Sequence, residues 1–167
     1  MRRALVITAS DRVDEGTRED TSGAGVGERL KVLGFAVDRA VLPDERAILT
    51  EVLRDSAGSH DLIVTTGGTG LTPRDVTPQA TQDAIDYEVP GLAEAMRAAG
   101  RRSTPLADLS RGVVGVIGRS LIVNLPGSPK GAMESLTAIE RVLDHALETL
   151  AGPFDHETRS PGGGGDR

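Results

Sequence analysis

Short apolar runs alternate along this chain with longer stretches in which apolar residues recur at helical spacing. Residues 5–7 form a continuous apolar run, which is typical of a central parallel strand covered on both faces. Strands are predicted over 5–7, 35–42 and 61–66, and helices over 22–33, 45–57, 92–99 and 132–150. Such alternation indicates a sheet with helices packed on its faces. The pattern therefore predicts an α/β fold with three layers, α/β/α, around a mostly parallel sheet.

One segment departs from the parallel pattern. Two apolar runs within residues 113–123 flank Gly118-Arg119, and glycine at the first central position suits a type II′ turn. We therefore expect an antiparallel hairpin element in the sheet. A further helix is predicted to start at Thr77 as N-cap, with Pro78 at its first helical position. Glycines that end predicted helices are Gly34, Gly100 and Gly152.

The length of 167 residues suits one domain, since a chain of this size buries roughly two-thirds of its unfolded surface on folding. We place that domain at residues 1–153 and predict a disordered tail over 154–167. Residues 160–165 read Ser-Pro-Gly-Gly-Gly-Gly, which is too little apolar surface to offset the entropy of ordering. No apolar stretch approaches the ~20 residues of a membrane span. We expect a cytoplasmic protein without membrane contact.

Composition narrows the chemistry. The chain has no cysteine, which excludes disulfides, a thiolate nucleophile and a cysteine-based metal site. Its formal net charge is −6, with two Phe, one Tyr and no Trp. It therefore lacks both the basic face and the stacking platforms of a nucleic-acid-binding protein. The three histidines lie apart in the sequence without a triad or zinc pattern, and we assign them no role. Any anionic ligand must be bound locally.

The strongest local signal is Thr65-Thr66-Gly67-Gly68-Thr69-Gly70, directly after a predicted strand. Three glycines let the backbone approach a ligand closely, and exposed N–H groups can donate to phosphate oxygens. An ordinary turn would need only one or two glycines. The loop is not a Walker A motif, because Leu71-Thr72 follows where Lys-Ser/Thr is required. The glycines of 23–27 miss the dinucleotide-binding spacing, and we interpret them as helix-to-sheet packing.

Two aspartates are candidate metal ligands. Asp75 lies beside the glycine loop in Pro73-Arg74-Asp75-Val76-Thr77-Pro78, and Mg²⁺ is commonly held by one or two carboxylates together with substrate phosphates. An Asx-type turn or helix cap explains Asp75 equally well. Asp44 follows the second strand, and taken alone it is better explained as a helix cap.

Two further turns could bind anions. In residues 124–131, the Ser128 hydroxyl, the Lys130 ammonium and the following helix N-terminus all favour an anion. Turn chemistry explains only Pro126-Gly127 and Pro129. Ser10-Asp11-Arg12 follows the first strand and is either another set of donors or a simple turn.

Together, four motifs resemble the molybdopterin adenylyltransferase family of molybdenum cofactor biosynthesis. They are residues 65–70, 73–78, 43–45 (Pro-Asp-Glu) and 124–130 (Asn-Leu-Pro-Gly-Ser-Pro-Lys), in the family's order within a match from about Arg3 to Gly152. The resemblance implies a three-layer α/β domain, assembled as a homotrimer. It also implies a nucleotidyltransferase that uses Mg²⁺ and ATP to transfer AMP to the terminal phosphate of molybdopterin, releasing pyrophosphate.

The resemblance assigns roles to the candidates. It places the two acidic positions of the active site on Asp44 and Asp75, as catalytic residues that hold the metal. With the donors after the first strand, the predicted binding residues are Ser10, Asp11, Thr66, Gly67, Gly68, Thr69, Gly70, Pro126, Gly127, Ser128 and Lys130. Two alternatives stay open: a catalytically silent molybdopterin-binding or carrier protein of the same fold, and another small phosphate-handling enzyme.

Overall fold

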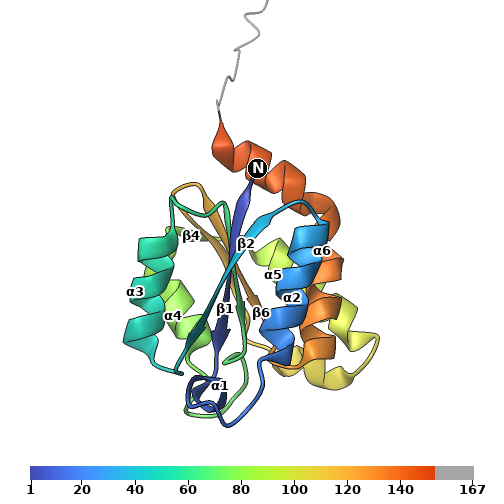
Figure 1. The fold of residues 1–167 in the computed structure, drawn as a ribbon. Helices are drawn as coiled ribbons and strands as arrows, with labels where there is room; N and C mark the ends of the chain where they lie inside the picture. Colours follow the sequence, from blue (N-terminus) through green and yellow to red (C-terminus); the bar gives the residue numbers. More distant parts are fainter. Residues whose placement is uncertain (153–167) are drawn as a thin grey trace, which may run out of the picture.

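The computed structural model describes residues 1–152, so the predicted tail at 154–167 lies outside the described residues. A single sheet in the order β2-β1-β3-β6-β5-β4 forms its centre (Figure 1). The strands are β1 (Arg3–Ala9), β2 (Ala36–Leu42), β3 (Leu62–Thr66), β4 (Tyr87–Glu88), β5 (Val114–Ile117) and β6 (Ser120–Leu125). Strands β2, β1, β3 and β6 are parallel, while β5 is antiparallel to both of its neighbours. The predicted hairpin element is confirmed.

Helices cover both faces of the sheet, which confirms the predicted three layers. They are α1 (Asp11–Asp14), α2 (Thr21–Val32), α3 (Arg46–Ser56), α4 (Thr77–Ala84), α5 (Pro90–Arg101) and α6 (Pro129–Ala151), with a 3₁₀ turn η1 (Pro105–Leu109). Figure 1 shows α3 and α4 on one face and α2, α5 and α6 on the other. None of the helices among residues 1–152 is both long and apolar enough to cross a membrane.

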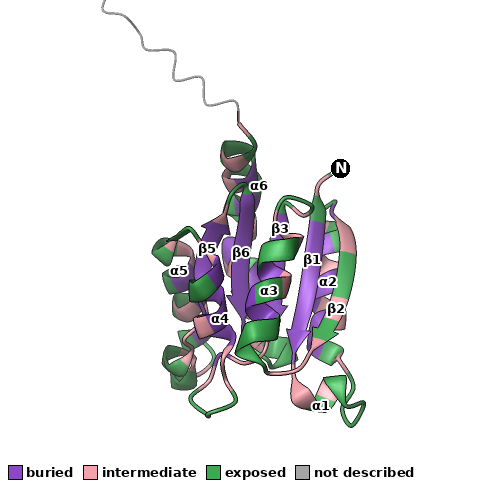
Figure 2. Ribbon diagram, turned by 90° about the vertical axis from the view of Figure 1, so that its left-hand side faces the viewer, coloured by how far each residue is buried: buried purple, intermediate pink, exposed green. Residues whose placement is uncertain are grey.

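The core is aliphatic and lies in two clusters, one on each side of the sheet. Every residue of β3 and of β6 is buried (Figure 2), and each fully buried Leu, Ile or Val contributes roughly 1.5–3 kcal/mol. Asn124 is buried among them, but its amide donates to Thr65 and Thr81 and accepts from the Val113 N–H. The central strands are thus buried up to their last residues, and the polar side chain of Asn124 has hydrogen-bond partners there.

The small residues of α2 allow close packing, as predicted. A Cβ added at Gly23 would lie 2.2 Å from Thr8 Oγ1, and one added at Gly27 would lie 3.4 Å from Arg39 Cδ. Both neighbours belong to strands, so the glycines bring the helix close against the sheet. Gly34, with a φ of +92°, ends α2 as predicted.

Two predicted helix ends are wrong, and α1 and β4 were not predicted. Gly100 lies inside α5 rather than after it; a Cβ there would come 2.7 Å from the Ala107 Cβ, so this glycine permits close packing against η1. Thr77 is the first residue of α4, with Val76 at the N-cap position, and its hydroxyl has no partner among the described residues. The Thr77 N–H instead donates to the Gly68 carbonyl, which draws the threonine against the glycine loop.

Candidate functional site

The carboxyl ends of four parallel strands meet at one edge of the sheet, the end where α1 lies in Figure 1. This is the edge at which open α/β sheets collect ligands. A cleft of about 660 Å³ opens there. The predicted site residues that line it are Ser10, Asp11, Asp44, Thr66, Gly67, Gly68, Asp75, Gly127 and Ser128. Segments from all four strand ends therefore surround one space.

The glycine loop needs its glycines. Gly67 and Gly68 have φ angles of +91° and +67°, in the left-handed region that only glycine adopts without strain. A Cβ at Gly67 would lie 2.5 Å from the Ala9 carbonyl oxygen, and one at Gly68 would lie 2.2 Å from Thr77 Oγ1. Within residues 1–152, the backbone N–H groups of 68–71 have no hydrogen-bond partner. The loop therefore offers consecutive free donors, which is the arrangement that binds anions.

The loops after β1 and β2 are clamped together. The Asp11 N–H donates to Asp44 Oδ2 at 3.0 Å, and the Asp44 N–H donates to Asp11 Oδ1 at 2.9 Å. Arg74, from the loop after β3, donates to both oxygens of Asp11 and to Glu45. The pKa of Asp11 is held below its usual range, first by Arg74 and then by the Asp44 N–H. This network ties three loops into one rigid rim.

Asp44 does not cap the helix that follows it. The N-cap of α3 is Glu45, without a side-chain cap hydrogen bond, and the Asp44 carboxylate instead bonds the loop after β1. Burial is the first cause that raises the pKa of Asp44 above its usual range; the nearby charges of Asp11 and Asp75 add to it, while the Asp11 N–H and Arg74 oppose it. The site therefore holds a carboxylate that favours a nearby cation.

Asp75 supports a turn and also faces the cleft. Its Oδ2 accepts hydrogen bonds from the N–H and the hydroxyl of Thr72. Within residues 1–152, Oδ1 of Asp75 and Oδ1 of Asp44 have no hydrogen-bond partner. The described residues contain no group of three or more His, Cys, Asp or Glu that could hold a metal. Two carboxylates with free oxygens suit Mg²⁺ only where a ligand supplies further oxygens.

The turn after β6 borders the cleft through Gly127, Ser128 and Pro129. Ser128 is the N-cap of α6, with its Oγ accepting from the Gly131 N–H, and this helix start lines the cleft. Lys130 does not reach the cleft: its side chain is 78% exposed, lies 3.8 Å from Glu134, and borders a groove between α5 and α6. The remaining anion donors here are the helix N-terminus and the Ser128 hydroxyl.

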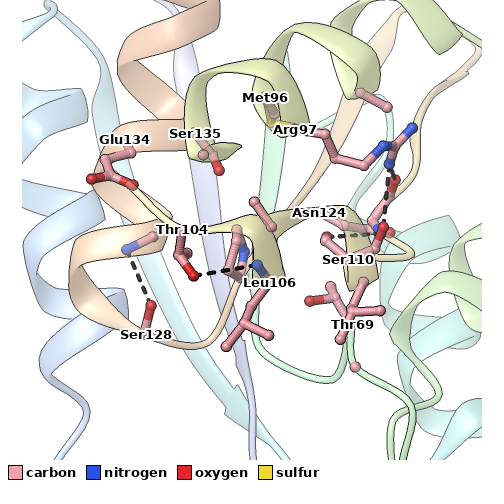
Figure 3. A pocket seen from close by; sticks show the side chains of 18 residues that line it. Thr69, Met96, Arg97, Thr104, Leu106, Ser110, Asn124, Ser128, Glu134 and Ser135 are labelled. Carbon is pink, nitrogen blue, oxygen red and sulfur yellow. Dashed lines mark hydrogen bonds between the residues drawn. The ribbon is translucent and has the colours of Figure 1, made fainter. Parts of the chain in front are cut away.

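A second cavity of about 360 Å³ was missed by the sequence analysis (Figure 3). Thr69, Gly70 and Pro126 line it, and it shares Ser128 with the cleft. The other walls come from α5, η1, the segment before β5 and the start of α6, and they include Ala93, Met96, Leu106, Leu109, Arg97 and Glu134. The sequence pattern predicted only a helix over 92–99 here, with no sign of a cavity beside it. The glycine loop and the turn after β6 thus separate a polar cleft from a largely apolar cavity.

A family model described as "Probable molybdopterin binding domain" matches residues 5–145. The chain belongs to this molybdopterin-binding domain family. The match includes every predicted site residue, and the resemblance inferred from the four motifs is confirmed.

Curated relatives in this molybdopterin-binding family match nearly the whole chain. The molybdopterin adenylyltransferase of Helicobacter pylori is 36% identical over 156 residues, which cover 89% of this chain and 88% of the relative. The molybdopterin adenylyltransferase of Escherichia coli K12 is 38% identical over 170 aligned positions, covering 91% and 87%.

Solved structures of the family show the same fold. The molybdopterin biosynthesis enzyme MoaB from Thermus thermophilus is 50% identical, with a TM-score of 0.82 over 92% of this chain and 98% of that one. The molybdopterin biosynthesis Mog protein from Mycobacterium ulcerans is 42% identical, with a TM-score of 0.86 over 90% and 99%. The arrangement of the loops around the cleft therefore rests on a fold that these proteins share.

Proposed function

We propose that this protein transfers AMP from Mg-ATP to the terminal phosphate of molybdopterin and releases pyrophosphate. The observation that carries the proposal is a cleft lined by two carboxylates, Asp44 and Asp75, and by the start of the glycine loop, whose N–H groups at 68–71 have no partner within residues 1–152. Two ligands that both carry phosphates repel one another. A protein that joins them must neutralise their charge and hold the reacting atoms in line, and these two effects supply most of the catalysis in phosphoryl-type transfers.

Each part of the cleft has a role in this reaction. The N–H groups of 68–71 donate to phosphate oxygens, and the N-terminus of α6 at Ser128 adds a second site of positive potential. Asp44 and Asp75 are the residues that would hold Mg²⁺ in this cleft. The metal, when bound, supplies charge neutralisation between the phosphates of the two substrates. An oxygen of the molybdopterin phosphate then bonds to the α-phosphorus of ATP, and the bond from that phosphorus to the pyrophosphate oxygen breaks.

The second cavity suits the ring of a substrate. Its largely apolar walls, including Met96 and Leu106, can cover the faces of a flat heterocycle, while Arg97 and Glu134 offer hydrogen bonds at its edges (Figure 3). Because this cavity meets the cleft at Ser128, a molecule with a ring in one and phosphates in the other would span both. Pterin and adenine each meet that description.

A direct assay tests the proposal. Purified protein is incubated with molybdopterin and Mg-ATP, and adenylylated pterin and pyrophosphate are measured. We expect both products in equal amounts. Release of AMP or phosphate from ATP without pterin would indicate a different phosphate-handling enzyme, and binding of molybdopterin without either product would indicate a silent carrier.

The Asp75→Asn variant tests the metal role within that assay. We expect transfer to fall about 100-fold or more, because a group that stabilises charge in the transition state is lost. The control is Asp55→Asn, which removes an exposed carboxylate from α3 and is expected to leave transfer unchanged. Undiminished transfer by Asp75→Asn would show that this aspartate does not hold the metal.

A further inference from the structure

Arg111 reaches the glycine loop from outside the cleft. It belongs to the segment between η1 and β5, and it lines neither the cleft nor the second cavity. Its backbone N–H donates to the Thr69 carbonyl at 3.0 Å. Its guanidinium donates through Nε to the Gly70 carbonyl at 2.8 Å and through Nη2 to the Asp75 carbonyl at 2.7 Å. One residue thus bonds three carbonyl groups in the segment between the glycines and Asp75.

These bonds determine where the loop's N–H groups point. In a planar trans peptide, the N–H lies opposite the C=O of the same unit. The carbonyls of Thr69 and Gly70 share their peptide units with the N–H groups of Gly70 and Leu71. Because Arg111 holds both carbonyls, those N–H groups are turned away from Arg111, and they belong to the 68–71 set that has no partner within residues 1–152. The arginine therefore keeps donors available for an anion.

The same guanidinium fixes the backbone of Asp75. Thr72 holds one oxygen of the Asp75 side chain, while Arg111 holds the Asp75 carbonyl. Arginine suits this task because its donors form a rigid planar fork that can bond two acceptors at set positions, whereas lysine carries a single flexible ammonium. The half-buried position of Arg111 further limits its rotation.

We propose that Arg111 is a positioning residue for the site: it orients the peptide groups of residues 69–71 toward the ligand and holds Asp75 in place, without touching substrate itself. This inference rests on the proposed function for its catalytic consequence. Its structural part, the clamp of Arg111 on residues 69–75, stands independently of which reaction the cleft performs.

Hydrogen exchange tests the clamp directly in the Arg111→Lys variant. Four amides in and beside the loop have known partners: the N–H groups of Gly67, Thr72, Asp75 and Thr77 donate to the Leu125 carbonyl, Asp75 Oδ2, the Thr72 carbonyl and the Gly68 carbonyl. We expect exchange at these amides to quicken about tenfold or more relative to strand amides of β1 and β3, since local opening becomes easier. The control, Arg46→Lys, removes a two-bond arginine contact to Asp83 between α3 and α4 and should leave loop exchange unchanged. Unchanged loop exchange in Arg111→Lys would overturn the clamp.

Kinetics test the catalytic consequence. In Arg111→Lys we expect the kcat of AMP transfer to fall about 10- to 100-fold, because displacing reacting groups by about 1 Å has effects of this size. The Mg²⁺ concentration for half-maximal rate should rise, since Asp75 is no longer held. The control Arg46→Lys should keep the wild-type kcat and the wild-type Mg²⁺ dependence, with each variant assayed at the same interval below its own melting temperature. Equal effects of the two variants, or an unchanged Mg²⁺ dependence in Arg111→Lys, would overturn the positioning role.

The two proposals can fail separately. If the wild-type protein makes no adenylylated pterin, the proposed function is wrong, and the positioning role is then measured by calorimetric titration with Mg-pyrophosphate. Weaker binding to Arg111→Lys than to Arg46→Lys would support the role, and equal binding would overturn it.

Discussion

The two ends of the central strands carry similar polar residue types, but these polar groups differ in whether they have hydrogen-bond partners within the protein. At the carboxyl end, the peptide groups of 68–71 and one oxygen each of Asp44 and Asp75 have no partner within residues 1–152. At the amino end, Ser120 Oγ accepts from the Gly58 N–H and donates to the His60 carbonyl, and Asp61 accepts from the Arg3 N–H. The carboxyl end therefore has polar groups available to a ligand, whereas these polar groups at the amino end are hydrogen-bonded within the protein's own turns.

The amino end even contains a serine, a histidine and an aspartate in contact. His60 Nδ1 lies 3.0 Å from Ser59 Oγ, and its Nε2 lies 3.0 Å from Asp38. The Ser59 hydroxyl, however, donates to the Ser56 carbonyl, and Asp38 is also bonded to Arg3. The hydroxyl proton is therefore directed away from the ring that would have to remove it in a catalytic triad. Residue types in contact do not make a site; unsatisfied groups facing a cleft are the better guide.

The largest difference in AMP transfer between the two ends is expected when a glycine at each end is replaced by alanine. Gly67→Ala places a Cβ 2.5 Å from the Ala9 carbonyl oxygen, and we expect AMP transfer to fall about 100-fold because the loop must move. Gly118→Ala imposes the same kind of strain at a φ of +57° in the β5–β6 turn, but nothing lies within 4 Å of the added atom. It should cost about 1–2 kcal/mol of stability and leave transfer unchanged. Similar losses of transfer in the two variants would contradict the distinction.

A smaller effect is expected at His60. The side chain is only 11% exposed and bonds Asp38, so His60→Gln should lower the free energy of unfolding by about 1–2 kcal/mol, measured by urea denaturation. AMP transfer should stay within the error of the wild type. His145→Gln, on the exposed side of α6, is the control for both measurements. If His60→Gln lost AMP transfer while the protein stayed folded under the assay conditions, the amino end would take part in the reaction, and the comparison would be wrong.

The smallest effect is expected from one ionised aspartate at each end, Asp38 and Asp44, whose contributions to the stability of the fold have opposite signs. The pKa of Asp38 is lowered from its ordinary 3.8 by Arg3 first and then His60, so its ionised form stabilises the fold above that pH and the benefit is lost on acidification. The pKa of Asp44 is raised from the same 3.8, chiefly by burial, so its ionised form destabilises the fold at neutral pH.

Matched asparagine variants measure this difference by thermal unfolding between pH 3 and pH 7, taken as about the range in which carboxylates titrate. At pH 7, Asp38→Asn should lower the melting temperature slightly, and the loss should shrink as the pH falls below the ordinary pKa of Asp38. Asp44→Asn should raise the melting temperature slightly while reducing transfer, with the gain fading as the pH falls through the raised pKa of Asp44. Changes of the same sign at pH 7 would contradict the assignment.

The fold was largely predictable because it depends on local patterns. The apolar runs at β1 and β3, the turn at Gly118-Arg119 and the long closing helix all followed from periodicity and turn chemistry. The converging loops followed from a topological rule, since parallel strands end at one edge. Gly100 was misread because a helix-ending glycine and a close-packed glycine look alike until the neighbouring Ala107 is known.

The site was less predictable because its remaining parts depend on contacts between distant segments. Arg111 is 36 positions from Asp75 in the sequence, and no local pattern marks an arginine that bonds carbonyl groups. The second cavity is bounded by α5, η1 and α6, and helical periodicity within one segment gives no sign of a space between three of them. Lys130 stays a prediction as an anion ligand: its charge and its neighbours suited an anion, while the structure places its exposed side chain beside Glu134 and the groove between α5 and α6.

The antiparallel direction of β5 increases the number of chain segments that lie at the edge of the sheet where the cleft opens. In a wholly parallel sheet, only the connections that leave the strands reach the working edge, and those that enter lie at the far side. Because β5 runs against its neighbours and pairs Val114 with Val123, the approach to β5 and the departure from β6 arrive together. The two-residue turn between β5 and β6 therefore places both Arg111, before β5, and the start of α6, after β6, at the edge where the cleft opens, and no further crossover connection is needed.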